Sequence, residues 1–125
     1  MDSDKLLNLA TELGCLLAES GAEISRVEES VYRLLRAYQG EDAQVFAIPS
    51  CLIVSLKAED GRPTTRMRRI RSHGTDIELL EACNALCREL CRTTPPLDEA
   101  RARVGRLPAS CRRHRPATVL LGDRK

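Results

Sequence analysis

Apolar residues recur every three to four positions along the first part of the chain and predict two helices. In residues 4–19 the apolar stripe consists of Leu6, Leu9, Leu13, Leu16 and Leu17. In the next segment it consists of Ile24, Val27, Val31, Leu34, Leu35 and Tyr38. Both are typical of amphipathic helices, the first ending at Ser20-Gly21 and the second at Gly40, a favourable C-terminal cap. The short break between them predicts an antiparallel helical hairpin.

The period then changes to two, which predicts three antiparallel strands. "AQVFAI" (43–48) and "CLIVSLK" (51–57) are rich in β-formers, and Pro49 between them favours a turn or bulge. Asp60-Gly61 is a strong hairpin signal and leads into the third strand. In that strand Thr65, Met67 and Arg69 alternate with Thr64, Arg66, Arg68 and Ile70.

Helical spacing returns after residue 72. Residues 75–78 (TDIE) form a capping box, which predicts a third helix through residue 91. Its expected apolar face consists of Ile77, Leu80, Cys83, Cys87, Leu90 and Cys91. A shorter fourth helix is expected from Thr94, as N-cap, to Gly105. The fold class is therefore α+β: a two-layer domain over residues 1–104, with a helical hairpin, a three-stranded antiparallel sheet and two further helices. The basic segment 105–125 lacks periodicity and is expected to be disordered.

Length and composition narrow the function classes. A chain of 125 residues with 42% apolar and 30% charged residues fits one globular domain. Its aromatic residues are Tyr32, Tyr38 and Phe46 alone, and its net charge is only +2, so no nucleic-acid partner is expected. We find no secretory signal and no apolar run of the ~18–20 residues that span a bilayer, and we read the six cysteines as reduced and the chain as cytoplasmic.

Arginines concentrate in the third strand and the loop after it. Residues 62–71 hold five arginines and no acid. Alternation places Arg66 and Arg68 on one face of the strand and Arg69 on the other. If the former face is free, its guanidinium groups suit carboxylates, phosphates or anionic lipid heads; alternatively the charge protects an edge strand from aggregation. His73, before a helix N-terminus, is a candidate anion contact or a plain loop residue.

Neither the cysteines nor any motif indicates catalysis or a metal. Cys83, Cys87 and Cys91 coincide with the apolar face of their helix, so we expect core packing rather than metal binding, and the same for Cys15 and Cys51. The common catalytic signatures are missing from the sequence. We therefore expect no metal, no cofactor and no enzymatic activity.

The segment "SGAEISRVEESVYRLL" (20–35) gathers several carboxylates. Ser20 and Glu23 have the spacing of a capping box, and Glu29 precedes Arg33 by four residues, which favours an ion pair. This leaves Arg26 and Glu28 unexplained, at the edge of the apolar stripe. We predict that they contact the sheet or a partner.

The runs "GAEISRVEESVYRLLRAYQ", "AQVFAIPSCLIVSL", "DGRPTTRMRRI" and "GTDIELLEACNALCREL" resemble, in order and spacing, the N-terminal cytoplasmic domain of the threonine/serine exporter family, which also includes dicarboxylate exporters. The resemblance covers about residues 4–104. The matching positions are Gly21, Ala22, Glu23, Arg26, Val27, Glu28, Pro49 and Arg69. It implies no catalytic role for them.

The resemblance implies a domain at the inner face of the cell membrane, partnered by a membrane-spanning exporter domain or subunit and acting on small amino acids or dicarboxylates. Where membrane helices would follow, this sequence reads "RLPASCRRHRPATVLLGDRK". We therefore expect a truncated or frame-shifted member, an isolated domain or one subunit of a split system, and a homo-oligomer is compatible with the sequence. The alternatives are a stand-alone module that binds or processes a small anionic metabolite through Arg66, Arg68, Glu28 and His73, and an inactive fragment.

Overall fold

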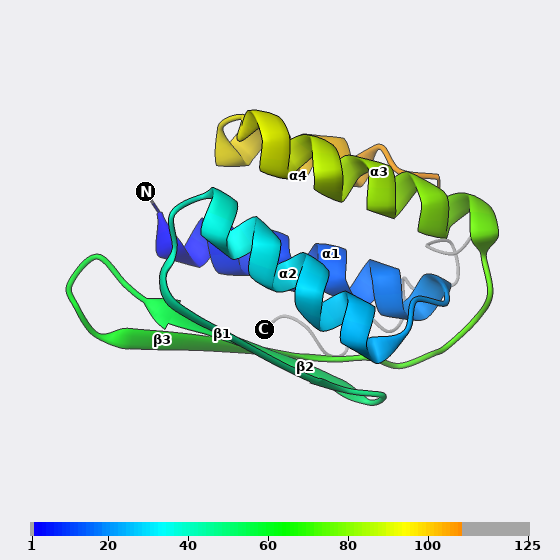
Figure 1. The fold of residues 1–125 in the computed structure, drawn as a ribbon, viewed down its shortest axis with the longest axis horizontal. Coiled ribbons are helices and arrows are strands. Elements are labelled where there is room, and N and C mark those ends of the chain that lie inside the picture. Colours follow the sequence, from blue (N-terminus) through cyan, green and yellow to red (C-terminus); the bar gives the residue numbers. More distant parts are fainter. Residues whose placement is uncertain (1, 109–125) are drawn as a thin grey trace.

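The computed structural model describes residues 2–108, and the chain folds in the order helix, helix, three strands, helix, helix (Figure 1). The helices are α1 (Ser3–Ser20), α2 (Ile24–Ala37), α3 (Ile77–Thr93) and α4 (Leu97–Gly105). The strands are β1 (Glu41–Ile48), β2 (Cys51–Lys57) and β3 (Pro63–Arg69). The predicted α+β class and element order are confirmed. Most of the predicted basic tail, from residue 109 onward, lies outside the described residues.

The elements stack in tiers rather than in a single helical layer. The sheet lies at the bottom of Figure 1, α1 and α2 cover one of its faces, and α3 and α4 lie on the far side of these helices. Among the described residues, α1 and α2 contact the strands, whereas α3 and α4 pack on α1, α2 and each other. The expected helix-covered sheet is present, with its helices in two tiers.

Helix α1 lies at the centre and is buried on nearly all sides. It contacts α2, α3, α4, β2 and β3. Its buried hydroxyl groups find partners within the helix: Thr11 donates to the Leu7 carbonyl at 2.9 Å and Ser20 to the Leu16 carbonyl at 2.8 Å. The amphipathic helix predicted for residues 4–19 implies that side chains outside its apolar stripe, such as Glu19, are exposed. That part of the prediction is wrong, because Glu19 is buried as well.

Gly14 allows α1 to approach α2 and the sheet closely. A Cβ atom at this position would lie 2.7 Å from Leu52 Cδ2 and 2.8 Å from Val31 Cγ2, distances that real Cβ atoms do not show. Val27, Val31 and Leu52 are themselves buried. We call these four residues (Gly14, Val27, Val31 and Leu52) the α1 seam, and it forms the contact between α1, α2 and β2.

The α1–α2 connection differs from the predicted capping box. Ser20 is the last residue of α1, and Gly21 follows in the left-handed conformation with φ 119°. The Ala22 N–H bonds back to the Leu17 carbonyl at 3.0 Å, which completes a Schellman-type cap. Glu23 precedes α2 without a side-chain cap. The capping box was therefore wrong, because the Ser20 hydroxyl is used inside α1.

Helix α2 ends one turn before the sheet. Its last residue is Ala37, and Gln39, not Gly40, takes the left-handed conformation with φ 64°. The Gly40 N–H then donates to the Leu35 carbonyl at 2.8 Å. Gly40 is buried, and a Cβ there would meet the Leu35 carbonyl oxygen at 3.0 Å, so its role is close packing after the cap.

The sheet is antiparallel in the order β1-β2-β3, and both predicted turns are present. Gly61 has φ 86° in the β2–β3 hairpin. Leu52, Val54 and Leu56 face the helices and are buried. The opposite, free face carries an apolar row across the three strands, in which the half-buried Ile53 lies between the exposed Phe46 and Met67.

The pairing of β3 with β2 corrects the interpretation of Arg66 and Arg68 as a free basic face of the sheet. The burial pattern of β3 shows that Thr64, Arg66 and Arg68 lie on the face toward the helices. Ile70 is buried on this same face. Thr65, Met67 and Arg69 lie on the free face. Met67 is 62% exposed there. The free face therefore combines its apolar row with the cations Lys57 and Arg69.

The boundaries of the last two helices also differ from prediction. The N-cap of α3 is Asp76, whose carboxylate accepts from the Leu79 N–H at 3.0 Å. Ile77 is 63% exposed and Leu79 is buried, so the apolar face begins two residues later than expected. Thr94 closes α3 in the left-handed conformation, and Pro96 is the N-cap of α4.

Candidate functional site

The six residues singled out in the sequence lie in separate places. Arg66 reaches α1, where its guanidinium donates to the side-chain oxygen of Asn8 and lies 3.5 Å from Asp4. Arg68 lies on the same face of β3, and its side chain forms no hydrogen bond or ion pair with another residue of segment 2–108. The predicted binding role of this arginine pair stays a prediction.

Arg69 and His73 lie near the β1–β2 turn. Arg69 is exposed on the free sheet face, opposite Cys51 in the β2–β3 register. The His73 ring nitrogen Nε2 donates to the Pro49 carbonyl, which ties the loop before α3 to this turn. The N-terminus of α3 is occupied by the Asp76 carboxylate. These contacts give His73 a structural partner, and its anion-binding role stays a prediction.

Glu28 makes the expected contact with the sheet. Its Oε2 accepts from the backbone N–H of Ala47 at 2.7 Å. Because β1 is an edge strand, an N–H that points away from β2 has no strand partner, and the carboxylate supplies one. Glu28 thus stabilises the edge of the sheet.

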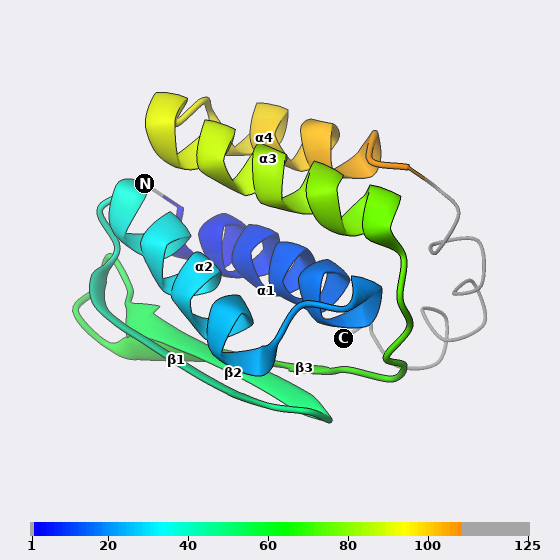
Figure 2. The same ribbon diagram turned by 45° about the vertical axis from the view of Figure 1, so that its right-hand side comes forward.

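Arg26 points to a different surface, a groove between α2 and α3. These helices lie side by side and run in the same direction, antiparallel to α1 (Figures 1 and 2). The groove has a volume of about 390 Å³. It is lined by Arg26, Glu29, Ser30, Arg33, Asn84, Cys87, Arg88, Cys91 and Arg92, and we call it the α2–α3 groove.

Positive charge dominates the α2–α3 groove. Four arginines and one carboxylate line it. Arg33 is paired with Glu29 at 2.6 Å, and Arg92 with Glu89 at 2.8 Å. The side chains of Arg26 and Arg88 form no hydrogen bond or ion pair within segment 2–108. The groove therefore presents two uncommitted guanidinium groups, one from each helix.

Two thiols lie at the bottom of the groove. Cys87 is buried, and its Sγ lies 3.7 Å from the Ser30 carbonyl oxygen of α2. A hydrogen bond from Cys87 lowers the pKa of Cys91 from 9.0 to about 7, and the Arg33 guanidinium acts in the same direction against partial burial. The same hydrogen bond and burial raise the pKa of Cys87. Cys91 is thus the thiol that ionises near neutral pH.

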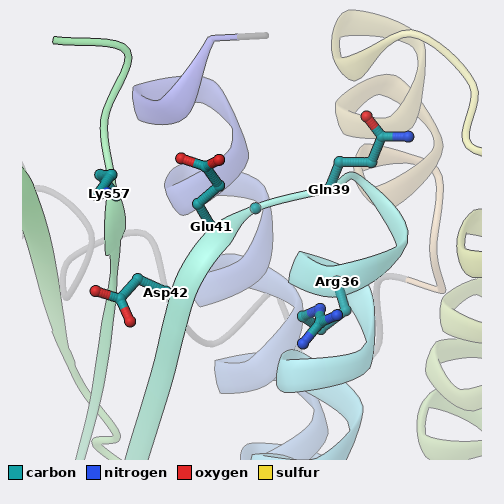
Figure 3. A pocket seen from close by; sticks show the side chains of 6 residues that line it. Arg36, Gln39, Glu41, Asp42 and Lys57 are labelled. Carbon is teal, nitrogen blue, oxygen red and sulfur yellow. The ribbon is translucent and has the colours of Figure 1, made fainter. Parts of the chain in front are cut away.

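Two further hollows flank α2 on its other side. One, of about 660 Å³, lies at the α2–β1 corner and is lined by Arg36, Gln39, Gly40, Glu41, Asp42 and Lys57. Figure 3 shows that its labelled side chains fan out and do not converge on one point. The other, of about 570 Å³, runs beside Tyr32 and Val45. Neither gathers like charges as the α2–α3 groove does.

The cysteines follow the sequence prediction in part. Cys15, Cys83 and Cys87 are buried in the core as expected. Cys91 is half-buried, packs against the core as expected and also lines the groove, whereas Cys51 is half-buried on the free sheet face, so core packing does not account for Cys51. Within residues 2–108, we find no cluster of three or more histidine, cysteine or acidic side chains suited to a metal ion.

Sequence reasoning missed most of the groove. Asn84, Arg88 and Arg92 recur every four residues on α3, and Arg26 and Arg33 are seven apart on α2, so each set lies along one helix side. This spacing was the available signal. It could not show that the two polar stripes face each other.

The length and hydropathy of a helix decide whether it can cross a membrane. Within residues 2–108, none of the helices combines the length and apolar content needed to span a bilayer.

Comparison with known proteins gave one match. Neither the curated proteins nor the solved structures yielded a similar chain. The sequence profile of one family matches residues 8–122, which includes most of α1 and every later element of the fold. That match covers most of the 125 residues and agrees with the resemblance found in the sequence. The chain belongs to the ThrE family of threonine/serine exporters.

Proposed function

We propose that this chain is the cytoplasmic part of a threonine/serine exporter and works with a membrane-spanning domain or subunit at the inner face of the cell membrane. The observation that carries the proposal is the family match over residues 8–122. Export requires a path through the bilayer, and segment 2–108 provides no spanning helix. A membrane-spanning partner is therefore part of the proposal.

The described fold suits a domain that positions or regulates such a partner rather than one that performs chemistry. The predicted site residues Arg66, Glu28 and His73 are engaged in contacts with α1, β1 and the β1–β2 turn, respectively. This arrangement disfavours the alternative of a metabolite-processing site built from those residues. Small amino acids are the substrate class we propose for export.

An efflux experiment in the source cell tests the proposal. Cells lacking the coding region for residues 8–105 are loaded with labelled threonine or serine, and efflux is followed over time. We expect slower efflux of both, restored when the chain is supplied again. Lysine efflux serves as the control substrate and should not change. Normal threonine and serine efflux in the deleted cells would contradict the proposal.

A matched variant separates function from mere expression. Gly14→Leu places a large side chain against Leu52 and Val31, so the chain should fail to fold and should not restore efflux. Lys57→Gln, an exposed change away from the seam, should restore it fully. In the same cells the chain should co-purify with the membrane-spanning partner after detergent extraction. Restoration by Gly14→Leu at equal expression would show that this fold is not what supports export.

A further inference from the structure

The α2–α3 groove is a built surface that the exporter assignment leaves unused. Its arginines come from two helices that are far apart in sequence and adjacent in space (Figure 2). Arginines on an isolated, solvent-exposed helix face would not lie opposite the arginines of a neighbouring helix. Like charges facing each other raise the free energy of the fold unless an anion lies between them.

We propose that the α2–α3 groove binds a small polyanion, whose carboxylate or phosphate oxygens are held by Arg26, Arg33 and Arg88. The guanidinium group presents a planar fork of donors that matches both kinds of oxyanion. The guanidinium groups of Arg26 and Arg88 are uncommitted within segment 2–108, so binding breaks no side-chain contact of either in that segment. Asn84 and Ser30 line the same groove and add neutral hydrogen-bonding groups.

The size and charge of the groove define the ligand class. A volume of about 390 Å³ accommodates a molecule of metabolite size but not a folded partner. Because Arg33 and Arg92 are paired with Glu29 and Glu89, two guanidinium groups are left uncommitted, and they favour a ligand with two negative groups. Because the groove is open to solvent on one side, screening should weaken binding as salt rises.

Cys91 supplies an internal reporter of occupancy. Its thiolate lies in the groove and is stabilised by a Cys87 hydrogen bond and by Arg33. An anion bound to Arg33 adds negative charge beside the sulfur and withdraws part of that stabilisation. Bound polyanion should therefore slow alkylation of Cys91 at pH 7 both by occlusion and by raising the thiol pKa.

Titration calorimetry on the full chain, at low and at physiological salt, tests the proposal. The probes are inorganic pyrophosphate, citrate and, as the monovalent comparison, acetate. We expect pyrophosphate or citrate to bind at least about tenfold more tightly than acetate, and the tighter of the two identifies the preferred oxyanion. If neither probe binds better than acetate, the proposal is overturned.

Paired variants distinguish the groove from general charge attraction. Arg26→Gln with Arg88→Gln should weaken the best probe at least about tenfold and leave the melting temperature unchanged, because neither side chain has a partner within segment 2–108. Arg69→Gln with Arg71→Gln removes the same charge outside the groove and should leave binding within about twofold. An equal loss in both pairs would overturn the site.

Protection of Cys91 from alkylation gives a readout of binding that does not depend on calorimetry. Iodoacetamide modification of the Cys91 peptide, followed by mass spectrometry at pH 7, should slow on addition of the best probe in the wild-type chain. It should not change in the Arg26→Gln, Arg88→Gln chain. Unchanged Cys91 reactivity at saturating probe would place the ligand elsewhere. These measurements need only the purified chain, so their failure would leave the exporter proposal intact.

Discussion

Helix α2 takes part in two contacts of opposite character, the α1 seam and the α2–α3 groove. In the seam, apolar side chains close around Gly14 so tightly that no Cβ fits. In the groove, arginines from two helices leave about 390 Å³ open. One side of α2 therefore contributes to the stability of the fold, and another side presents uncommitted positive charge. The difference predicts that changes on one side should affect unfolding and changes on the other should affect binding.

Leu52→Ala should have the largest effect on stability. Leu52 is fully buried in the α1 seam, and removing such a side chain leaves a cavity worth about 2–5 kcal/mol in the free energy of unfolding. Urea denaturation followed by circular dichroism measures it. Phe46→Ala, on the exposed face of the same sheet, is the control and should change stability by less than about 1 kcal/mol. Equal losses would mean that the free face is covered in solution.

Gly14→Ala should come next, with a loss of about 1–3 kcal/mol from overpacking. Its Cβ would collide with Leu52 Cδ2 and Val31 Cγ2. Combining it with Leu52→Ala removes the nearer obstacle. The double variant should therefore lose less stability than the sum of the two single losses. Strict additivity in urea denaturation would show that the crowding at Gly14 is relieved by another route.

Glu28→Ala should cost about 1 kcal/mol, because the Ala47 N–H loses its charge-assisted partner. The neighbouring change Glu29→Ala removes only an exposed ion pair with Arg33 and should cost about 0.3–0.5 kcal/mol. Thermal and urea unfolding compare the two directly. A larger loss for Glu29→Ala would reverse the roles assigned to these carboxylates.

The smallest effect on stability, and the sharpest on chemistry, should come from Arg33→Gln. In the wild-type chain, Cys91 alkylation should rise through a midpoint near pH 7, since the thiolate is the reactive form and its pKa is lowered to about 7. Removing the guanidinium should move the midpoint upward, toward 9.0. The urea-unfolded chain supplies the unperturbed reference. A midpoint unaffected by Arg33→Gln would assign the shift to Cys87 alone.

The sequence predicted the elements well because each period was regular. The alternation in 51–57 placed Leu52, Val54 and Leu56 on one face, and those residues are buried. It did not predict which face of β3 is covered, because each set mixes apolar and charged side chains. The answer depends on α1, whose Asn8 and Asp4 receive Arg66.

The burial of α1 was missed for a related reason. The expected stripe counted only large residues, whereas Ala10, Gly14 and Ala18, four residues apart, are buried as well. Small residues give little hydrophobic signal but allow neighbouring elements to approach closely. The capping boxes failed because a hydroxyl such as that of Ser20 has several possible partners, and only the path of the chain decides among them. The groove depends on which helices become neighbours, and local spacing does not encode that.

The central position of α1 has a consequence for synthesis. This helix leaves the ribosome before the other described elements, yet its covering partners include α3 and α4, whose first residues are made about 70 residues or more after the start of α1, several seconds at ~5–20 residues per second. Until then a leucine-rich segment has no complete environment. Folding of this domain therefore cannot proceed element by element from α1, and the nascent chain should depend on protection by chaperones until α4 is released.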